Sequence, residues 1–214
     1  MLYDYAAIKN GSYGKLMKAY YAKQDAEKLS GKGDTSQKLT LMKTSADSLK
    51  KSADALNDSS LWEKKKIKKK DEKTGEEIEA EDYDWDKITK AVKSFVEDYN
   101  DVVKEAGESN TKDVLRNASW MTGMTDKNSN MLAKIGITIG KGNKLELDED
   151  ALKQADISSL KTVFTGYNSF VSKISQKATG ISNAANRASA TYTNNGTYSK
   201  TDSSLTSSKI DKEV

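Results

Sequence analysis

The sequence predicts a mainly α protein, an elongated antiparallel helical bundle of the coiled-coil type with one or two short β-hairpins. Several segments carry apolar residues at alternating spacings of three and four, the heptad pattern of helices that pack along a seam. Only 36% of the 214 residues are apolar and 31% are charged, which suits narrow helical seams better than a thick core. The chain has no proline, a residue that breaks helix interiors.

The first half of the chain predicts three helices. The first is expected over residues 12–28, before a glycine-rich turn, with Leu16, Met17, Tyr20 and Tyr21 on one side. The second begins after a cap at Asp34, Thr35 or Ser36 and ends near Asn57; its seam is Leu39, Met42, Ala46, Leu49, Ala53 and Leu56. The third begins near Asp84 or Asp86 and ends at Gly107; its seam is Ile88, Val92, Phe95, Tyr99, Val102 and Ala106.

Two further long helices are expected in the second half. One covers residues 111–134 and ends at Gly136; its seam is Val114, Ala118, Met121, Thr125, Asn128, Leu132 and Ile135. The last is predicted to be the longest, and one continuous seam runs through Leu160, Phe164, Tyr167, Val171, Ile174, Ala178, Ile181 and Ala185. None of these helices can bury its stripe alone, so they are expected to pack on one another.

Two hairpins interrupt the helices. In the first, residues 61–84, a lysine-rich arm is followed by a turn at residues 73–75 and a glutamate-rich arm, so basic residues are expected opposite acidic ones. In the second, Ile137 and Ile139 face Leu145 and Leu147 across a glycine-rich turn. A lone two-stranded ribbon is marginal in water, so the second hairpin is expected to lie against the bundle. Asp148 is expected to cap a short helix after it.

The predicted domain organisation is a single elongated bundle over residues 1–190. Residues 61–84 form a charged hairpin insertion in that bundle. Residues 191–214 are rich in Ser and Thr and are expected to be a disordered tail.

Composition argues against catalytic and cofactor chemistry. The chain has no cysteine and no histidine, which excludes thiolate chemistry and removes the commonest general base and metal ligand. The acidic run Asp148–Glu149–Asp150 lacks the ligand alternation of a calcium loop, and a helix cap is the better interpretation. We therefore predict no catalytic residue, no cofactor and no metal site.

Charge and hydropathy also limit the classes of partner that the chain can bind. The net charge of +3 gives little attraction to nucleic acid, and acidic residues follow the lysine run directly, so no nucleic-acid partner is predicted. No apolar run reaches the ~20 residues of a membrane span. Trp62 is the candidate contact residue for a protein partner, because a charged hairpin offers it little cover. Trp85 is expected to staple the start of its helix, and Trp120 to flank a seam.

Three stretches within residues 85–185 resemble the C-terminal region of the flagellar filament cap family, also called hook-associated protein 2. They are "VKSFVEDYNDVV" (residues 92–103), "LAKIGITIGKGNKLELDEDALKQA" (residues 132–155) and "LKTVFTGYNSFVSKI" (residues 160–174). In that family two β-rich domains separate the N-terminal and C-terminal helices, and here residues 61–84 occupy that place. The resemblance is therefore to a reduced or divergent relative.

The resemblance implies a helical domain near a filament axis, export by the flagellar route without a cleaved signal, and a role in capping the filament and folding flagellin. From it we predict a non-enzymatic structural or assembly protein of a bacterial flagellum or related appendage. Its expected partners are flagellin-like subunits or further copies of itself, and its expected location is extracellular. The alternative is an intracellular helical adaptor or chaperone-like bundle that binds an unrelated partner.

Overall fold

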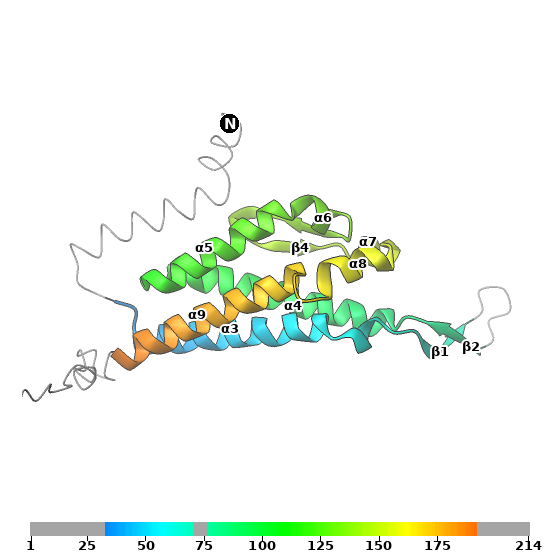
Figure 1. Ribbon diagram of the computed structural model, residues 1–214, viewed down its shortest axis with the longest axis horizontal. Coiled ribbons are helices and arrows are strands. Elements are labelled where there is room, and N and C mark those ends of the chain that lie inside the picture. The colour runs from blue at the N-terminus through cyan, green and yellow to red at the C-terminus, as the bar shows by residue number, and fades with distance from the viewer. Residues whose placement is uncertain (1–32, 71–76, 192–214) are drawn as a thin grey trace, which may run out of the picture.

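The computed structural model describes residues 33–70 and 77–191, and its body is an antiparallel bundle of four long helices (Figure 1). The four are α3 (Ser36–Asn57), α4 (Trp85–Glu108), α5 (Lys112–Lys127) and α9 (Phe170–Thr191). Helix α3 packs against both α4 and α9, and α5 packs against the same two helices from the other side. The predicted fold class is confirmed. The predicted helix over residues 12–28 and the turn over residues 73–75 lie outside the described residues, as does the tail from residue 192 onward.

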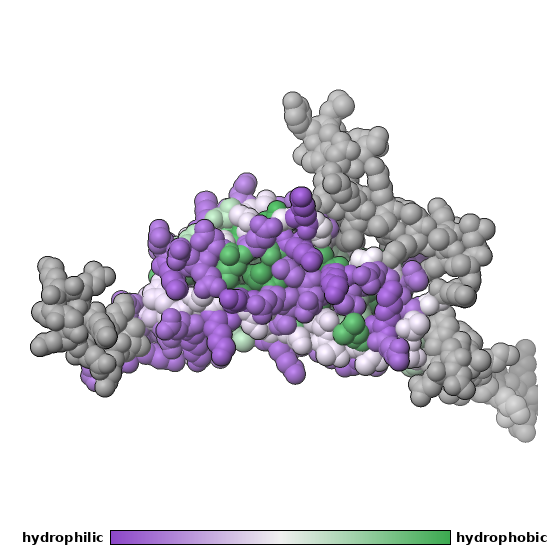
Figure 2. Space-filling view, turned by 180° about the vertical axis from the view of Figure 1, so that it is seen from behind, coloured by the Kyte–Doolittle hydropathy of each residue, from purple (hydrophilic) through white to green (hydrophobic). Residues whose placement is uncertain are grey.

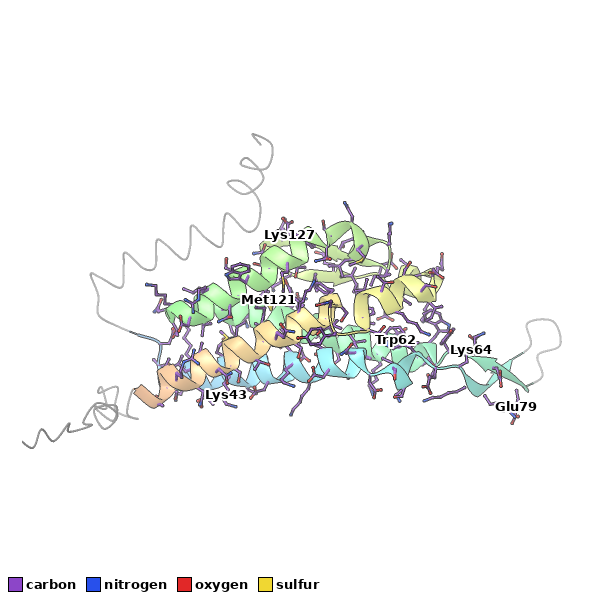
Figure 3. All side chains as sticks on the ribbon, in the orientation of Figure 1. Lys43, Trp62, Lys64, Glu79, Met121 and Lys127 are labelled. Carbon is purple, nitrogen blue, oxygen red and sulfur yellow. The ribbon has the colours of Figure 1, made fainter. Side chains whose placement is uncertain are left out.

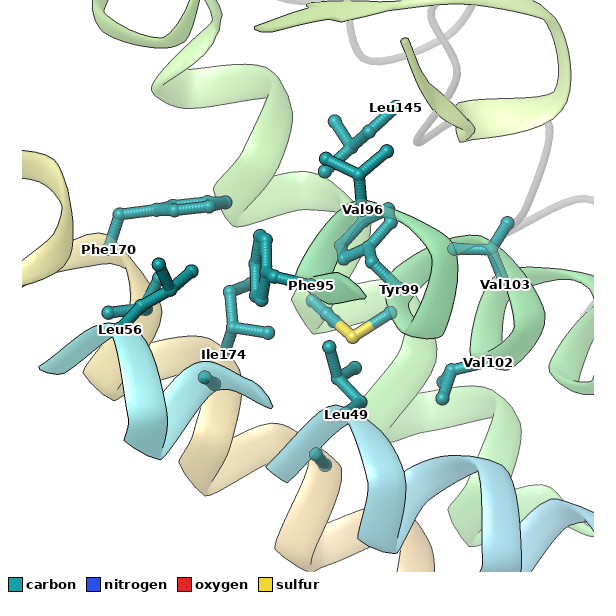
Figure 4. Close-up of a cluster of buried hydrophobic side chains, with 14 of the residues drawn as sticks. Leu49, Leu56, Phe95, Val96, Tyr99, Val102, Val103, Leu145, Phe170 and Ile174 are labelled. Carbon is teal, nitrogen blue, oxygen red and sulfur yellow. The ribbon is translucent and has the colours of Figure 1, made fainter. Parts of the chain in front are cut away.

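The seams predicted for α3 and α4 are confirmed residue by residue. All six seam residues of α3 and all six of α4 are buried, and those of α4 are fully so. Helix α3 begins at the Thr35 cap and ends at Asn57, and α4 begins after the Asp84 cap. Helix α4 ends at Glu108, one residue beyond the predicted Gly107. Aromatic rings of α4 fill the centre of the core, where Phe95 meets Phe170 edge-on at 6.3 Å (Figure 4).

A seven-residue repeat in α3 explains its close pairing with α9. The stretches "KTSADSL" (residues 43–49) and "KKSADAL" (residues 50–56) each place a small alanine and a leucine in the seam. Each repeat also places an aspartate at the seam's edge, where Asp47 accepts from Ser182 at 2.6 Å and Asp54 from Ser175 at 2.7 Å. Because 47 pairs with 182 and 54 with 175, the two helices run in opposite directions.

Two predicted helices are broken where the sequence suggested continuity. The helix predicted over residues 111–134 divides at Asn128 into α5 and the short α6 (Ser129–Ala133). The side-chain amide of Asn128 donates to the Met124 carbonyl at 2.7 Å, which takes up an acceptor at the end of α5. The predicted last helix divides into α8 (Ile157–Phe164) and α9 around Gly166, whose φ is +98°. Tyr167 lies in this break and is 83% exposed, so its predicted place in the seam is wrong.

The small hairpin lies against the bundle, as predicted. Strands β3 (Ile137–Ile139) and β4 (Leu145–Leu147) pair with Ile137 opposite Leu147 and Ile139 opposite Leu145. The short turn η2 (Lys141–Asn143) joins them. Gly136 enters the hairpin with φ +79°, and a Cβ there would lie 2.6 Å from the Asp148 carbonyl oxygen, so a larger residue does not fit. Asp148 caps α7 (Glu149–Gln154) by accepting from two backbone N–H groups, as predicted.

One amide side chain attaches this hairpin to α4. Asn100 donates from its side chain to the Leu145 carbonyl at 2.9 Å, and its Oδ1 accepts from the Leu145 N–H at 2.7 Å. The Leu145 side chain, only 2% exposed, packs into the core beside Val96 and Tyr99 (Figure 4). Both backbone groups of this strand residue are therefore satisfied by a helix, and the hairpin needs no third strand.

Asn100→Ala should lower the free energy of unfolding by about 2 kcal/mol, because a part-buried N–H and C=O of Leu145 lose their partners. Urea unfolding measures the loss, and faster amide exchange at Leu145 locates it. Lys104→Ala, at an exposed position one turn further along α4, is the control and should change stability little. An Asn100→Ala chain with an unchanged midpoint would show that the hairpin holds by apolar contacts alone.

Candidate interaction surfaces

Two kinds of site, a metal site and a membrane span, are absent from the described residues. Within residues 33–70 and 77–191, no three acidic side chains are grouped so that they could hold a metal ion. None of the helices found in those ranges is long and apolar enough to span a membrane. The face shown in Figure 2 is mostly hydrophilic, with a hydrophobic area near the middle of the body.

Trp62 lies inside the body and offers no contact surface. It belongs to the turn η1 (Ser59–Trp62), before the charged hairpin, and is 2% exposed. Its ring stacks on Phe164 with centroids 5.6 Å apart, and its Nε1–H donates to the Leu56 carbonyl at 2.8 Å. The premise that the hairpin leaves Trp62 uncovered is wrong, because the chain does not enter the hairpin until Lys65. Figure 3 shows the difference: Trp62 lies within the helical body, and Glu79 lies out along the hairpin.

The charged hairpin has the predicted pairing of opposite charges. Strands β1 (Lys65–Lys70) and β2 (Glu77–Asp82) are antiparallel, and Lys65, Lys66, Lys68 and Lys70 stand opposite Asp82, Glu81, Glu79 and Glu77. The hairpin extends from one end of the bundle, beyond the helices (Figure 1). Among side chains that are described, Lys65, Lys66, Glu79 and Glu81 are all exposed.

The base of this hairpin is fixed to the bundle by aromatic and cationic side chains. Trp85, the first residue of α4, meets the Tyr83 ring edge-on at 6.4 Å. The ammonium groups of Lys64 and Lys161 each lie 5.7 Å from the centre of the same ring. Lys161 comes from α8, far along the chain, and no local pattern in the sequence links it to Tyr83. The hairpin therefore leaves the bundle in a defined direction.

Three large apolar side chains are exposed among the described residues: Leu41 at 50%, Trp120 at 58% and Tyr167 at 83%. Trp120 projects from α5, and Lys177 of α9 places its ammonium group 5.4 Å from the ring centre. The prediction that Trp120 flanks a seam describes this position correctly, since its neighbour Met121 is fully buried. The exposed Trp120 ring of α5 and the Lys177 ammonium group of α9 lie side by side on the surface, an arrangement suited to a protein contact.

A carboxylate at the other end of the bundle joins the start of α3 to the turn between α4 and α5. The Asp34 side chain is 1% exposed. It accepts from the Ser109 hydroxyl at 2.6 Å, from the N–H groups of Asn110 and Thr111 at 2.9 Å, and from the Thr111 hydroxyl at 2.7 Å. Thr111 is the N-cap of α5 and makes no side-chain capping bond, and Asp34 accepts from the backbone N–H of this cap residue from a distant segment. From the sequence alone, Asp34 is predictable only as a candidate cap for α3.

Burial and hydrogen bonding have opposite effects on the pKa of Asp34. Burial alone raises it, and the bonds from Ser109, Thr111 and the backbone outweigh that effect and hold the pKa below the usual 3.8. At Asp98, which is part-buried on α4, burial raises the pKa and the nearby carboxylates of Asp101 and Glu97 add to the rise, while a hydrogen bond from Ser52 opposes it. Ionised Asp34 therefore stabilises the folded state, whereas ionised Asp98 destabilises it.

Asp98→Asn should stabilise the protein at neutral pH by a few tenths of a kcal/mol. The raised pKa of Asp98 means that its ionised form is disfavoured in the folded state, a cost that grows as pH rises above 3.8 and is complete above the folded pKa. Below 3.8 the carboxyl is protonated in both states, and the variant should match the parent. Urea unfolding at neutral pH and at a pH below 3.8 tests this prediction. Asp126→Asn, at an exposed position, is the control. An Asp98→Asn chain that is less stable than the parent at neutral pH would contradict it.

The fold and these surfaces define a helical-bundle protein that presents contact surfaces. Comparison with protein families gives a more specific answer: residues 109–213 match the model described as flagellar hook-associated protein 2 C-terminus. The resemblance stated from the sequence is thereby confirmed for that part, which is just under half of the chain. The stretch over residues 92–103 lies before the matched part, and the other two quoted stretches lie within it. No significant match was found among curated proteins or among solved structures.

Proposed function

We propose that this protein is a non-enzymatic structural or assembly component of a bacterial flagellum or a related surface appendage, where it binds flagellin-type subunits. The observation that carries the proposal is the match of residues 109–213 to the C-terminal region of flagellar hook-associated protein 2. The matched residues include α5, α9 and the β3–β4 hairpin, so they supply half of the long helices of the bundle.

The arrangement of the matched part supports a role in assembly. Helices α5 and α9 bury their seams against α3 and α4, and their outer faces carry Trp120 and Lys177. A rigid bundle with an exposed aromatic anchor suits the binding of a helix from another subunit. The proposed location is outside the cell, reached through the flagellar export apparatus.

Export and binding test the proposal separately. Blots of the secreted fraction should contain the protein when the flagellar export apparatus works and lack it when the apparatus is disabled. A protein that stays inside the cell in both cases would favour the intracellular adaptor and overturn the flagellar assignment.

For binding, the purified full chain is immobilised and presented with purified flagellin. The parent chain and Gln176→Asp, a change at an exposed position of α9, should both retain flagellin. Trp120→Ala should weaken retention while leaving the melting temperature nearly unchanged, because its ring is 58% exposed. A parent chain that retains no flagellin would contradict this part of the proposal.

A further inference from the structure

The sheet formed by β1 and β2 has two outer edges of opposite charge. Within the described residues this sheet contains only these two strands, so each has an outer edge that pairs with no other described strand. Strand β1 reads "KKIKKK" and strand β2 reads "EIEAED". An open strand edge presents backbone N–H and C=O groups that can pair with a further strand.

Charge on an edge strand usually prevents such pairing, but here it prevents only some of the possible arrangements. If β1 met β1 of a second copy, lysines would oppose lysines, and if β2 met β2, acidic residues would oppose acidic residues. If β2 of one copy met β1 of the next, lysines would oppose acids. That pairing is antiparallel, as within one chain, and can repeat the intrachain register in which Lys66 stands opposite Glu81.

We propose that the β1–β2 hairpin is a self-association site, in which the acidic edge of β2 in one copy pairs with the basic edge of β1 in the next. The position of the hairpin suits this contact, since it extends beyond the helices (Figure 1) and its base is fixed by Tyr83, Trp85 and Lys161. The proposal concerns contacts between copies of this chain and does not depend on the flagellar role.

The contact is heterologous, so it generates a series of copies and not a closed pair. Each copy adds two strands, about 10 Å along the sheet. A four-helix bundle is at least about 20 Å across, since one helix with its side chains has a diameter of about 10 Å. Neighbouring bundles fit only if they spread apart around the narrower hairpins. Successive copies must therefore be rotated relative to one another, and that rotation decides whether the series closes into a ring or continues as a helical filament.

Because the chain has no cysteine, engineered cysteines give an unambiguous test of this pairing. Two full-length single-cysteine chains are prepared, Lys66→Cys and Glu81→Cys, one of them with a size tag, and both positions are exposed. Directly opposed residues of antiparallel strands are close enough for a disulfide. Under mild oxidation at low salt, the mixture should give cross-linked dimers of one tagged and one untagged chain, several-fold more than either chain gives alone.

The control pairs Glu81→Cys with Lys104→Cys, an exposed position on α4 near the far end of the bundle. It should cross-link only at the level of random collision. High salt should reduce the 66–81 product several-fold, because it screens exposed charge pairs. Dimers formed mainly by each chain with itself would indicate two-fold pairing and overturn the proposal, as would a 66–81 yield no greater than the control.

Molar mass provides a measurement that requires no substitution. Light scattering on the parent chain at low salt should show a mass that rises with protein concentration and falls when salt is added. A constant monomer mass would overturn the proposal. A rising mass without the 66–81 cross-link would place self-association elsewhere on the molecule and overturn it equally.

Discussion

Val171→Asp should abolish the folded state at 25 °C. Val171 is the second residue of α9. It is fully buried and belongs to the hydrophobic core shared by the four long helices. An aspartate there loses the apolar contacts of valine and buries a carboxyl group in the hydrophobic core. The lost packing and the buried carboxyl together cost more than about 5 kcal/mol, which is comparable with the whole stability of many domains. Circular dichroism should show the loss of most helical signal and of the cooperative melt.

Gln176→Asp is the matched control for this change. It introduces the same aspartate and the same change of charge five residues further along α9, at an exposed position. Its stability should stay within about 0.5 kcal/mol of the parent, so any collapse of Val171→Asp reflects burial and not helix propensity or net charge. A Val171→Asp chain that melts at the parental temperature would show that α9 does not contribute to the core as the structure places it.

The seams were predictable because burial follows the helical period whatever the distant partners are. Phe95 and Val171 could be assigned to the core without knowing which helices they would meet, and both are fully buried. The two helix breaks could not be predicted from the apolar spacing, for a related reason. Thr125 and Leu132 on either side of Asn128 are seven residues apart, and so are Phe164 and Val171 on either side of the Gly166 break. A break that spans one heptad leaves the apolar spacing unchanged, and only Asn128 and Gly166 themselves gave a local signal.

The contact residues were harder to predict, because they depend on neighbours that are far away in the chain. The charged residues that follow Trp62 predict an exposed ring, whereas the ring is buried because it stacks on Phe164 of α8. The opposite edges of the charged hairpin were predictable, since their pairing is local and the charges are segregated by strand. The position of the hairpin relative to the bundle was not, because it depends on Lys161 lying over Tyr83.

Asp34→Ala should lower the free energy of unfolding by about 3 kcal/mol, the second largest effect expected here. The substitution leaves the N–H groups of Asn110 and Thr111 and two hydroxyl groups without the carboxylate, in a part-buried place. It also removes negative charge from the N-terminus of α5, which has no capping side chain of its own. Asp126→Ala, at an exposed position of the same helix, should cost less than about 0.5 kcal/mol.

The pH dependence of this effect distinguishes the charge of Asp34 from its shape. The pKa of Asp34 in the folded state lies below 3.8, so its contribution is fully present above 3.8 and is lost as pH falls through the folded value. Asp34→Asn keeps the shape and one acceptor oxygen, so at neutral pH it should lie between the parent and Asp34→Ala. Below 3.8 the gap between parent and Asp34→Asn should narrow, because protonation gives the parent a neutral side chain too. A gap that stays constant down to acid pH would mean that Asp34 holds the start of α3 to the turn between α4 and α5 through packing, with no contribution from its charge.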